Sequence, residues 1–133
     1  MNKYIYMAGI VDGEGSISIR RENPKGNYVY YRVTLRVTNT NKELIDWLQK
    51  TFNGTVHKRK NWKSCWKPCF EWKVYDSIAI TIIKRILPYL IVKLQQASLA
   101  IHFQRAKSNF SQYFIKMKEL NRRGISSVEV KEK

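Results

Sequence analysis

The stretch Met7–Gly15, with the sequence MAGIVDGEG, contains the most informative pattern in this chain. It ends a largely apolar segment that we interpret as a short helix from Lys3 to Asp12, closed by the glycines that follow. Gly9 and Gly13 are four residues apart and share one helical face, where small residues let a second helix backbone approach closely. The alternative is a glycine-rich helix end that packs against no partner. It accounts for Gly13, but Gly9 would then destabilise the helix by ~1 kcal/mol with nothing to compensate. We therefore predict a dimer interface on this face, formed by Ala8, Gly9, Asp12 and Gly13.

Glu14 directly follows this helix, where exposed carbonyl groups already carry partial negative charge. A carboxylate there is destabilising unless a cation joins it. If two such helices pair, two Glu14 side chains and nearby backbone carbonyls form an all-oxygen site, the ligand set that Mg²⁺ and similar hard ions prefer. The sequence therefore predicts a divalent-metal site at Glu14.

The pattern changes from helical to alternating beyond Gly15. In Ser16–Arg21, two isoleucines alternate with polar residues, and the turn Asn23–Asn27 places Pro and Gly where a hairpin loop favours them. In the next run, Tyr28–Thr38, odd positions are mainly apolar and even positions are polar or basic. This alternation predicts a long antiparallel hairpin with one apolar face and one polar, basic face.

The remaining segments predict a helix, a second hairpin and further helices. The first of these helices is expected to start at Thr40, which has capping-box spacing with Glu43, and to end at Asn53–Gly54. The expected ranges of the other elements are Thr55–Trp62 and Cys69–Tyr75 for the strands, and Ser77–Leu87, Lys93–Lys107 and Ser111–Arg123 for the later helices. This order predicts an α+β fold in which helices cover the apolar face of a four-stranded antiparallel sheet. No break in composition divides the chain, so we expect a single domain over residues 1–123 and a charged, flexible tail over residues 124–133.

The net charge of the chain indicates what kind of molecule it binds. The chain has 25 Lys and Arg against 10 Asp and Glu, a formal net charge of +15, and self-repulsion of this kind opposes folding. DNA, RNA or an anionic membrane would account for such an excess. No apolar run approaches the ~20 residues that span a bilayer, and the N-terminus carries acids and glycines where a signal peptide has an apolar core. We therefore predict a nucleic-acid partner and no membrane.

The outward positions of the two hairpins suit a DNA groove. An ordinary solvated face mixes both charge signs, whereas this face is mainly basic, with Tyr, Thr and Asn between the charges. Arg reads guanine edges, Asn reads adenine, and hydroxyl groups reach bases or phosphates. The run Tyr28–Thr38 extends about 33 Å, which corresponds to roughly ten base pairs. The predicted DNA contacts are Ser18, Arg20, Tyr28, Tyr30, Arg32, Thr34, Arg36, Thr38, His57, Arg59, Asn61, Glu71 and Lys73.

The cysteines and histidines do not form a zinc motif. Cys65 and Cys69 frame a loop-like stretch, CWKPC, and His57 and His102 are not spaced with them as recognised metal ligands. We therefore expect no zinc. Because nothing marks the chain as secreted, we expect reduced thiols rather than a disulfide.

The stretch MAGIVDGEGS resembles the LAGLIDADG motif, which defines a family of homing endonucleases. It is identical to that motif at Ala8, Gly9, Asp12 and Gly15, and similar at Met7, Ile10, Val11 and Glu14. The predicted order of elements over residues 3–107 also resembles the αββαββα core of the family. The resemblance implies a curved four-stranded antiparallel sheet with helices on one face and DNA on the other.

The resemblance also implies roles for individual residues by position. Glu14 matches the metal-binding acid, Gly13 matches a position whose backbone carbonyl also meets metal, and Asp12 matches a structural position. In single-motif members a Gln at the end of the second strand orders water near the metal, and Asn39, one methylene shorter, stands there. Such members also place a Lys shortly after a proline that ends a helix; Lys93 occupies that place, where an ordinary surface lysine is the alternative. The implied catalytic residues are Glu14, Asn39 and Lys93, with Mg²⁺ as the metal and Mn²⁺ as its substitute.

The function implied by the resemblance is a homodimeric, site-specific endonuclease that makes staggered double-strand breaks in a long, roughly palindromic DNA target. Two binding functions are alternatives, because the same fold occurs in RNA maturases and in DNA-binding regulators that do not cleave. RNA is the partner under the first of these. A basic structural RNA-binding protein is a third alternative, but it does not account for MAGIVDGEG. The acid at position 14 favours the enzyme.

Overall fold

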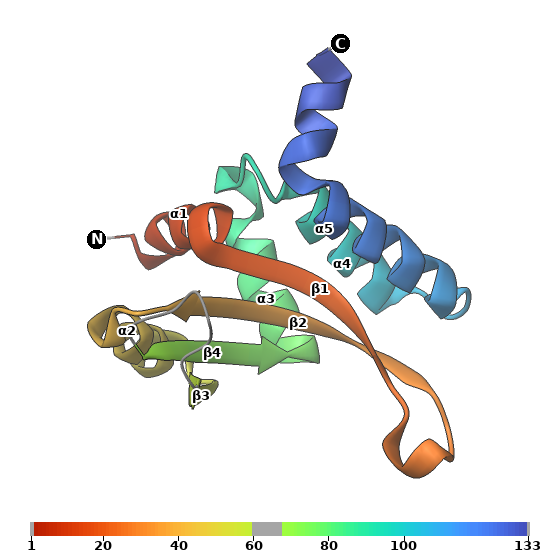
Figure 1. Ribbon diagram of the computed structural model, residues 1–133, viewed down its shortest axis with the longest axis horizontal. Helices are drawn as coiled ribbons and strands as arrows, with labels where there is room; N and C mark the ends of the chain where they lie inside the picture. The colour runs from red at the N-terminus through yellow and green to blue at the C-terminus, as the bar shows by residue number, and fades with distance from the viewer. Residues whose placement is uncertain (1, 60–67, 133) are drawn as a thin grey trace.

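A four-stranded sheet forms the centre of the molecule in a computed structural model that describes residues 2–59 and 68–132, with side chains up to residue 122 (Figure 1). The elements in chain order are α1 (Lys3–Glu14), β1 (Gly15–Glu22), η1 (Pro24–Gly26), β2 (Tyr30–Asn39), α2 (Lys42–Phe52), β3 (Thr55–Arg59), β4 (Cys69–Tyr75), α3 (Asp76–Ile86), η2 (Leu87–Tyr89), α4 (Leu94–Arg105) and α5 (Phe110–Glu132). This order of helix, hairpin, helix, hairpin and helices confirms the predicted α+β fold class.

All neighbouring strands are antiparallel, in the spatial order β1–β2–β4–β3. The two hairpins therefore meet through β2 and β4 at the centre of the sheet, and β1 and β3 form its edges. Arg20 pairs with Arg32 across the first hairpin, and Arg36 pairs with Lys73 across the central strands. Because paired residues point to the same side, the even positions of β1 and β2 share one face with the odd positions of β3 and β4. We call this the outer face.

The opposite face of the sheet forms the core. On this face, the side chains of the first hairpin that are at most 4% exposed are Ile17, Ile19, Val33, Leu35 and Val37. Each contributes about 1.5–3 kcal/mol when it is removed from water. Trp72 from β4 is fully buried with them, and its indole N–H donates to the carbonyl of Asn53 at 2.6 Å. The alternation of the sequence thus correctly predicted which side of the hairpin is buried.

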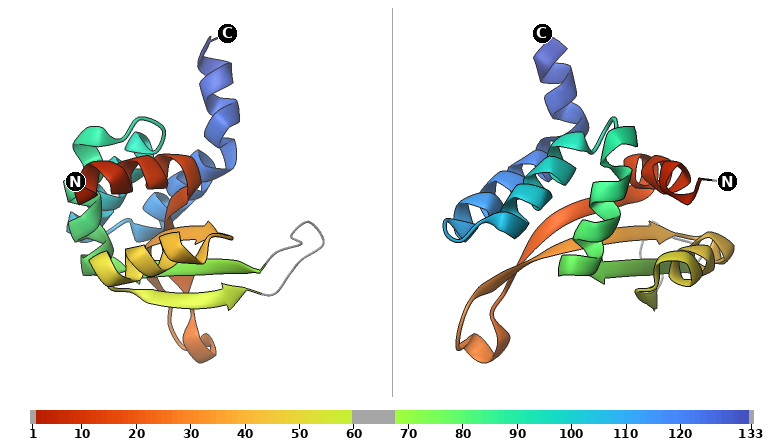
Figure 2. Two further views of the ribbon diagram at one scale, coloured as in Figure 1. Left: turned by 90° about the vertical axis from the view of Figure 1, so that its left-hand side faces the viewer. Right: turned by 180° about the vertical axis from the view of Figure 1, so that it is seen from behind.

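The helices cover this apolar face and leave the outer face open. Helices α1, α3, α4 and α5 pack against β1 or β2, and α2 packs against β2, β3 and β4 (Figures 1 and 2). Ala8 of α1 and Leu48 of α2 are among the side chains that these helices bury. The β1–β2 hairpin projects beyond the helices and lengthens the open face (Figure 1). Within the described residues, no helix has both the length and the apolar character needed to cross a bilayer.

The observed elements differ from the predicted ones mainly at their ends. Strand β2 begins at Tyr30, so Tyr28 precedes the strand, and Val29 is 43% exposed where the hairpin projects past the core. Helix α5 continues to Glu132, so most of the region predicted as a flexible tail is helical. Gly124 does not end the helix because one Gly in a helix costs only about 1 kcal/mol relative to Ala.

Candidate metal site and nucleic-acid interface

Glu14 lies at the C-terminal end of α1, where the chain turns into β1. The helix closes there because the backbone N–H of Gly15 donates to the carbonyl of Val11. A side chain at Gly15 has no room, since its Cβ would lie 2.8 Å from the Cα of Val11. The glycine therefore lets the strand leave close beside the helix, and the Glu14 side chain stays exposed at the junction.

Asn39, the last residue of β2, holds the carboxylate of Glu14. Its side-chain Nδ2 donates to Oε2 of Glu14, and its Oδ1 accepts the backbone N–H of Asn41 at 2.7 Å. Both ends of the amide are engaged, so its orientation is fixed. The hairpin register brings these residues together, because Gly15 pairs with Val37, two residues before Asn39. The short Asn side chain thus contacts the acid itself.

Asp12 binds the loop that leads into α4. Its Oδ2 accepts the backbone N–H of Ile91 at 2.8 Å, and its Oδ1 accepts those of Val92 and Lys93 at 3.1 and 3.0 Å. Successive N–H groups at the start of a helix favour negative charge, which explains why a carboxylate is used here. Asp12 is therefore structural, and it ties the backbone of Lys93 to the end of α1 that carries Glu14.

Oxygen atoms at the C-terminal end of α1 are candidate metal ligands. Glu14 offers a carboxylate, and the last four carbonyl groups of a helix, Gly13 among them, lack partners in the helical ladder. Within the described residues, no three His, Cys, Asp or Glu side chains are placed to hold a metal ion. The donors at this end of α1 are oxygens, which suit a hard divalent ion.

The exposed face of α1 has open space at two glycines. A Cβ added at Gly9 or Gly13 would meet no atom of the described chain within 4 Å. The packing of this chain therefore requires neither glycine, although each weakens the helix by about 1 kcal/mol relative to Ala. Ala8 does not lie on this face as predicted: it is 1% exposed, because α1 turns it toward the core. The carboxylate of Asp12 is likewise committed to its own chain.

The outer face gathers basic side chains from all four strands. The predicted contact residues that the strand register places there are Ser18, Arg20, Tyr30, Arg32, Thr34, Arg36, Thr38, His57, Arg59, Glu71 and Lys73. Five of these side chains are Arg or Lys, while the strand acids of this face are Glu22 and Glu71. Asn61 and Cys65 lie outside the described residues. The face is thus positively charged along both hairpins.

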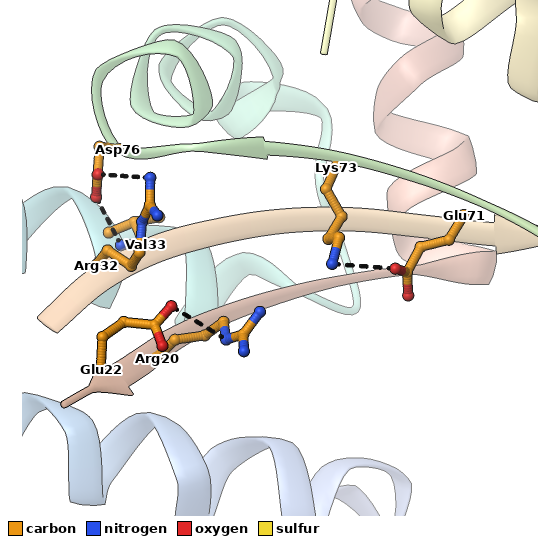
Figure 3. Close-up of polar contacts among 7 residues, drawn as sticks. All are labelled: Arg20, Glu22, Arg32, Val33, Glu71, Lys73 and Asp76. Atoms are coloured by element: carbon orange, nitrogen blue, oxygen red, sulfur yellow. Dashed lines mark hydrogen bonds and ion pairs between the residues drawn. The ribbon is translucent and has the colours of Figure 1, made fainter. Parts of the chain in front are cut away.

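Glu71 lies among three of these cations. Its carboxylate is 3.1 Å from Nζ of Lys73, 3.6 Å from Nη1 of Arg59 and 3.7 Å from Nη1 of Arg36 (Figure 3 shows the Lys73 contact). Glu71 is only 7% exposed, because it stands in a central strand and its neighbours cover it. The expectation that Glu71 contacts DNA directly does not fit this burial. Its ion pairs hold the surrounding cations in place instead.

Arg32 is held by two residues that the sequence alone did not identify. Its Nη2 lies 3.3 Å from Oδ2 of Asp76, and its guanidinium carbon lies 3.9 Å from the ring centroid of Tyr75 (Figure 3 shows the Asp76 contact). Two signals were present in the sequence. Tyr75 continues the outward alternation of Glu71 and Lys73, and Asp76 stands at the junction between strand and helix.

Exposure along the outer face rises from the middle of the sheet to the tip of the hairpin. Thr34 is 3% exposed, and its Oγ1 has no hydrogen-bond partner in the part of the chain that the structure describes. The prediction that Thr34 contacts DNA therefore conflicts with its burial between two neighbouring strands. At the far end, Tyr28 and Tyr30 are 60% and 39% exposed, with stacked rings whose centroids are 5.7 Å apart. Ser18 and Thr38 are half-buried.

Comparisons with solved structures find a similar fold in homing endonucleases. The homing endonuclease I-CvuI in complex with the I-CreI target, in the presence of Mg and with the DNA not cleaved, is 28% identical with a TM-score of 0.66. The match covers 77% of this chain and 66% of that chain, so this chain spans just under two thirds of the other's length. No match was found among curated proteins.

Two further solved structures share the fold at lower identity. The archaeal intron-encoded homing endonuclease I-Vdi141I, complexed with DNA, is 14% identical with a TM-score of 0.71, and the match covers 88% of this chain and 82% of that chain. I-SmaMI, bound to an uncleaved DNA target with calcium ions, is 18% identical with a TM-score of 0.63, covering 89% of this chain and 44% of that chain.

The family model of the LAGLIDADG endonucleases matches residues 7–110. This match begins at the stretch Met7–Gly15, continues through all four strands and ends at the start of α5. It therefore covers well over half of the chain and includes both the helix end that carries Glu14 and the basic outer face. The chain belongs to the LAGLIDADG endonuclease family.

Proposed function

We propose that this chain is a site-specific DNA endonuclease that acts as a homodimer and cuts a long, roughly palindromic double-stranded target by divalent-metal-dependent hydrolysis. The observation that carries the proposal is the exposed carboxylate of Glu14, held at the C-terminal end of α1 by the amide of Asn39. A carboxylate at this end of a helix is unfavourable unless positive charge meets it. A metal ion and the phosphate groups that accompany it account for this placement.

A second copy of the chain supplies the missing half of the site. Gly9 and Gly13 leave open space on the exposed face of α1, and small residues on a helix allow close backbone contact. In a two-fold dimer the same face of each α1 meets its counterpart. Since Glu14 is the residue after Gly13, such a contact brings the two Glu14 side chains near one another.

Glu14 and the backbone carbonyl of Gly13 are the groups that would hold the ion. A divalent ion such as Mg²⁺, or Mn²⁺ in its place, supplies Lewis-acid charge for phosphodiester hydrolysis when it is bound. Asn39 fixes one oxygen of Glu14 and leaves the other available. Lys93 would add positive charge beside the scissile phosphate, from a backbone position that Asp12 fixes.

The outer face would bind the DNA. Its arginines and lysines neutralise phosphates or read guanine edges, and its hydroxyl groups reach bases or backbone. The first hairpin covers roughly ten base pairs at 3.4 Å per step, so a dimer would read about twenty. Glu71 and Thr34 are buried and would not touch the DNA. The more exposed Arg20, Arg36 and Arg59 would contact it instead.

The test begins with selection of a preferred target from randomised duplexes in Ca²⁺, an ion with which I-SmaMI was seen on uncleaved DNA. The selected duplex is then incubated with Mg²⁺ and wild-type protein, Glu14→Gln or Glu43→Gln. Glu43 is the matched control because it is an exposed acid in the first turn of α2. We expect wild type and Glu43→Gln to cut at one place in an EDTA-sensitive manner, and Glu14→Gln to bind without cutting.

Other outcomes select among the alternatives. Cleavage by Glu14→Gln at the wild-type rate would overturn the metal-ligand assignment. Salt-sensitive, sequence-specific binding with no cleavage by any of the three proteins would identify a non-cleaving DNA-binding regulator. A preference for structured RNA over every duplex would identify a maturase.

A further inference from the structure

Asp76 has a backbone conformation that directs its carboxylate at strand β2. Its φ is +49°, in the left-handed region that few residues other than glycine adopt, although Asp is one of those enriched there. From this position, directly after β4, Oδ1 accepts the backbone N–H of Val33 at 3.1 Å while Oδ2 lies 3.3 Å from Nη2 of Arg32 (Figure 3). One carboxylate thus binds both the strand and the side chain of the adjacent residue.

Tyr75 restrains the same guanidinium in a second direction. The guanidinium carbon of Arg32 lies over the ring of Tyr75, 3.9 Å from its centroid, in a cation–π contact. The ring fixes the tilt of the guanidinium and Asp76 fixes its rotation, so the side chain is only 28% exposed. Its Nε is buried with no hydrogen-bond partner among residues 2–59 and 68–122. The contact with Asp76 uses Nη2, and the end of the fork carries further N–H groups on Nη1 and Nη2.

Arg20 offers a direct comparison on the same surface. It pairs with Arg32 across the hairpin, so both side chains lie on the outer face at the same level. Its acid partner, Glu22, is 3.9 Å away, and the Arg20 side chain is 46% exposed (Figure 3 shows the contact). The two arginines therefore have the same charge and location, but Arg32 is held by a closer acid and by a ring.

We propose that Asp76 is a positioning residue that orients Arg32 to read one guanine in each half of the DNA target. The proposal rests on the DNA-binding function proposed above. The end of an Arg fork matches O6 and N7 of guanine in the major groove. A free Arg side chain loses rotamer freedom when it binds, whereas Arg32 has already lost it in the folded chain. A wrong base leaves this fixed fork unpaired, so discrimination is stronger than at a mobile arginine.

The test measures base preference at every position of the selected target for wild type and four variants. Asp76→Asn keeps a side chain that tolerates the left-handed conformation and an oxygen for the N–H of Val33, but removes the charge that faces Arg32. Arg32→Lys keeps the charge and removes the fork. Glu22→Gln is the matched control, because it makes the same chemical change as Asp76→Asn beside Arg20. Tyr75→Leu removes the ring and leaves Asp76 in place.

We expect wild type to prefer guanine at one position of each half-site by roughly 5- to 150-fold, the range typical of a bidentate contact. Arg32→Lys, Asp76→Asn and Tyr75→Leu should each lower the preference at that same position and leave it unchanged elsewhere. Glu22→Gln should retain the full preference there. Circular dichroism tests whether each variant is folded. If Asp76→Asn does not fold, Tyr75→Leu alone decides the test.

Two results would overturn the inference while the proposed function stands. In the first, Arg32→Lys loses the guanine preference and folded Asp76→Asn keeps it. In the second, Asp76→Asn and Tyr75→Leu weaken every position equally, which is the behaviour of residues with only a structural role. If wild type itself selects no duplex sequence, the proposed function fails, and this inference fails with it.

Discussion

Asp12 shows how one short side chain joins distant parts of the molecule. It accepts backbone N–H groups from residues 79, 80 and 81 positions further along the chain. Asp12→Asn removes the charge and turns an N–H donor toward one of these groups. We expect it to lower the free energy of unfolding by about 2–3 kcal/mol, measured by urea denaturation with tryptophan fluorescence.

Asp46→Asn is the control for Asp12→Asn. Asp46 pairs with Lys42 at 2.9 Å on the exposed side of α2, and an exposed helical pair of this kind contributes about 0.3–0.5 kcal/mol. A loss of stability for Asp12→Asn no larger than that for Asp46→Asn would contradict the structural role of Asp12.

Single residues were predictable from the sequence where a local motif defined them. The nine-residue stretch singled out Glu14, and the resemblance to the family implied Asn39 and Lys93 by position, in roles that stay predictions. The sequence could not show that Asn39 contacts Glu14 itself, because that contact depends on the hairpin register. The ion pair of Asp76 with Arg32 was equally hidden, since it joins the first residue of α3 to strand β2, more than 40 residues earlier in the chain.

At the scale of the element, Gly9 within helix α1 and Gly15 directly after it have different surroundings, so alanine substitutions at the two positions test how this helix packs. Gly9 has open space, whereas a Cβ at Gly15 would lie 2.8 Å from the Cα of Val11. We expect Gly9→Ala to raise the free energy of unfolding of the separate chain by about 1 kcal/mol, because Ala is the better helix former. The same methyl group should hold two α1 helices apart and weaken the dimer.

Two measurements separate these effects. Sedimentation velocity over a concentration series reports dimerisation, for which wild type should reach twice the 15.8 kDa mass of one chain. Urea denaturation at concentrations below association reports the stability of the chain alone. Gly15→Ala should lower that stability through its clash with α1. Dimerisation of Gly9→Ala with wild-type affinity would show that this face of α1 is not the interface.

The faces of the hairpins were predictable because alternation with a period of two is a local property of the sequence. The burial of Thr34 and Glu71 was not, although both occupy polar positions of the alternation. They stand in β2 and β4, the two central strands of the order β1–β2–β4–β3, where neighbours on both sides cover them. Strand order is a tertiary property, and the sequence specifies it only through the packing of the whole chain.

At the scale of the whole molecule, the net charge of +15 predicted a polyanionic partner, and the fold collects part of that charge on one open face. The total charge alone could not show how the cations are arranged. The structure pairs three of them, Arg36, Arg59 and Lys73, with one buried acid, Glu71. Their capacity to neutralise phosphates is therefore partly taken up inside the protein.

Glu71→Gln tests whether Glu71 competes with DNA for these cations. The substitution removes one negative charge and releases three cations toward the outer face. Each additional phosphate contact steepens the slope of log K against log salt concentration by about 0.9 for double-stranded DNA. We therefore expect Glu71→Gln to bind random duplexes more tightly than wild type at low salt, with a slope steeper by about 1 or more. Fluorescence anisotropy titrations at several salt concentrations measure both quantities.

Asp46→Asn makes the same change in net charge on α2, which packs against the opposite face of the sheet. If total charge alone sets the affinity, the two variants should behave alike. If the arrangement on the outer face sets it, only Glu71→Gln should change the slope. An unchanged slope in Glu71→Gln would mean that the three cations already contact phosphates fully in the wild type, so that Glu71 orders them without competing with DNA.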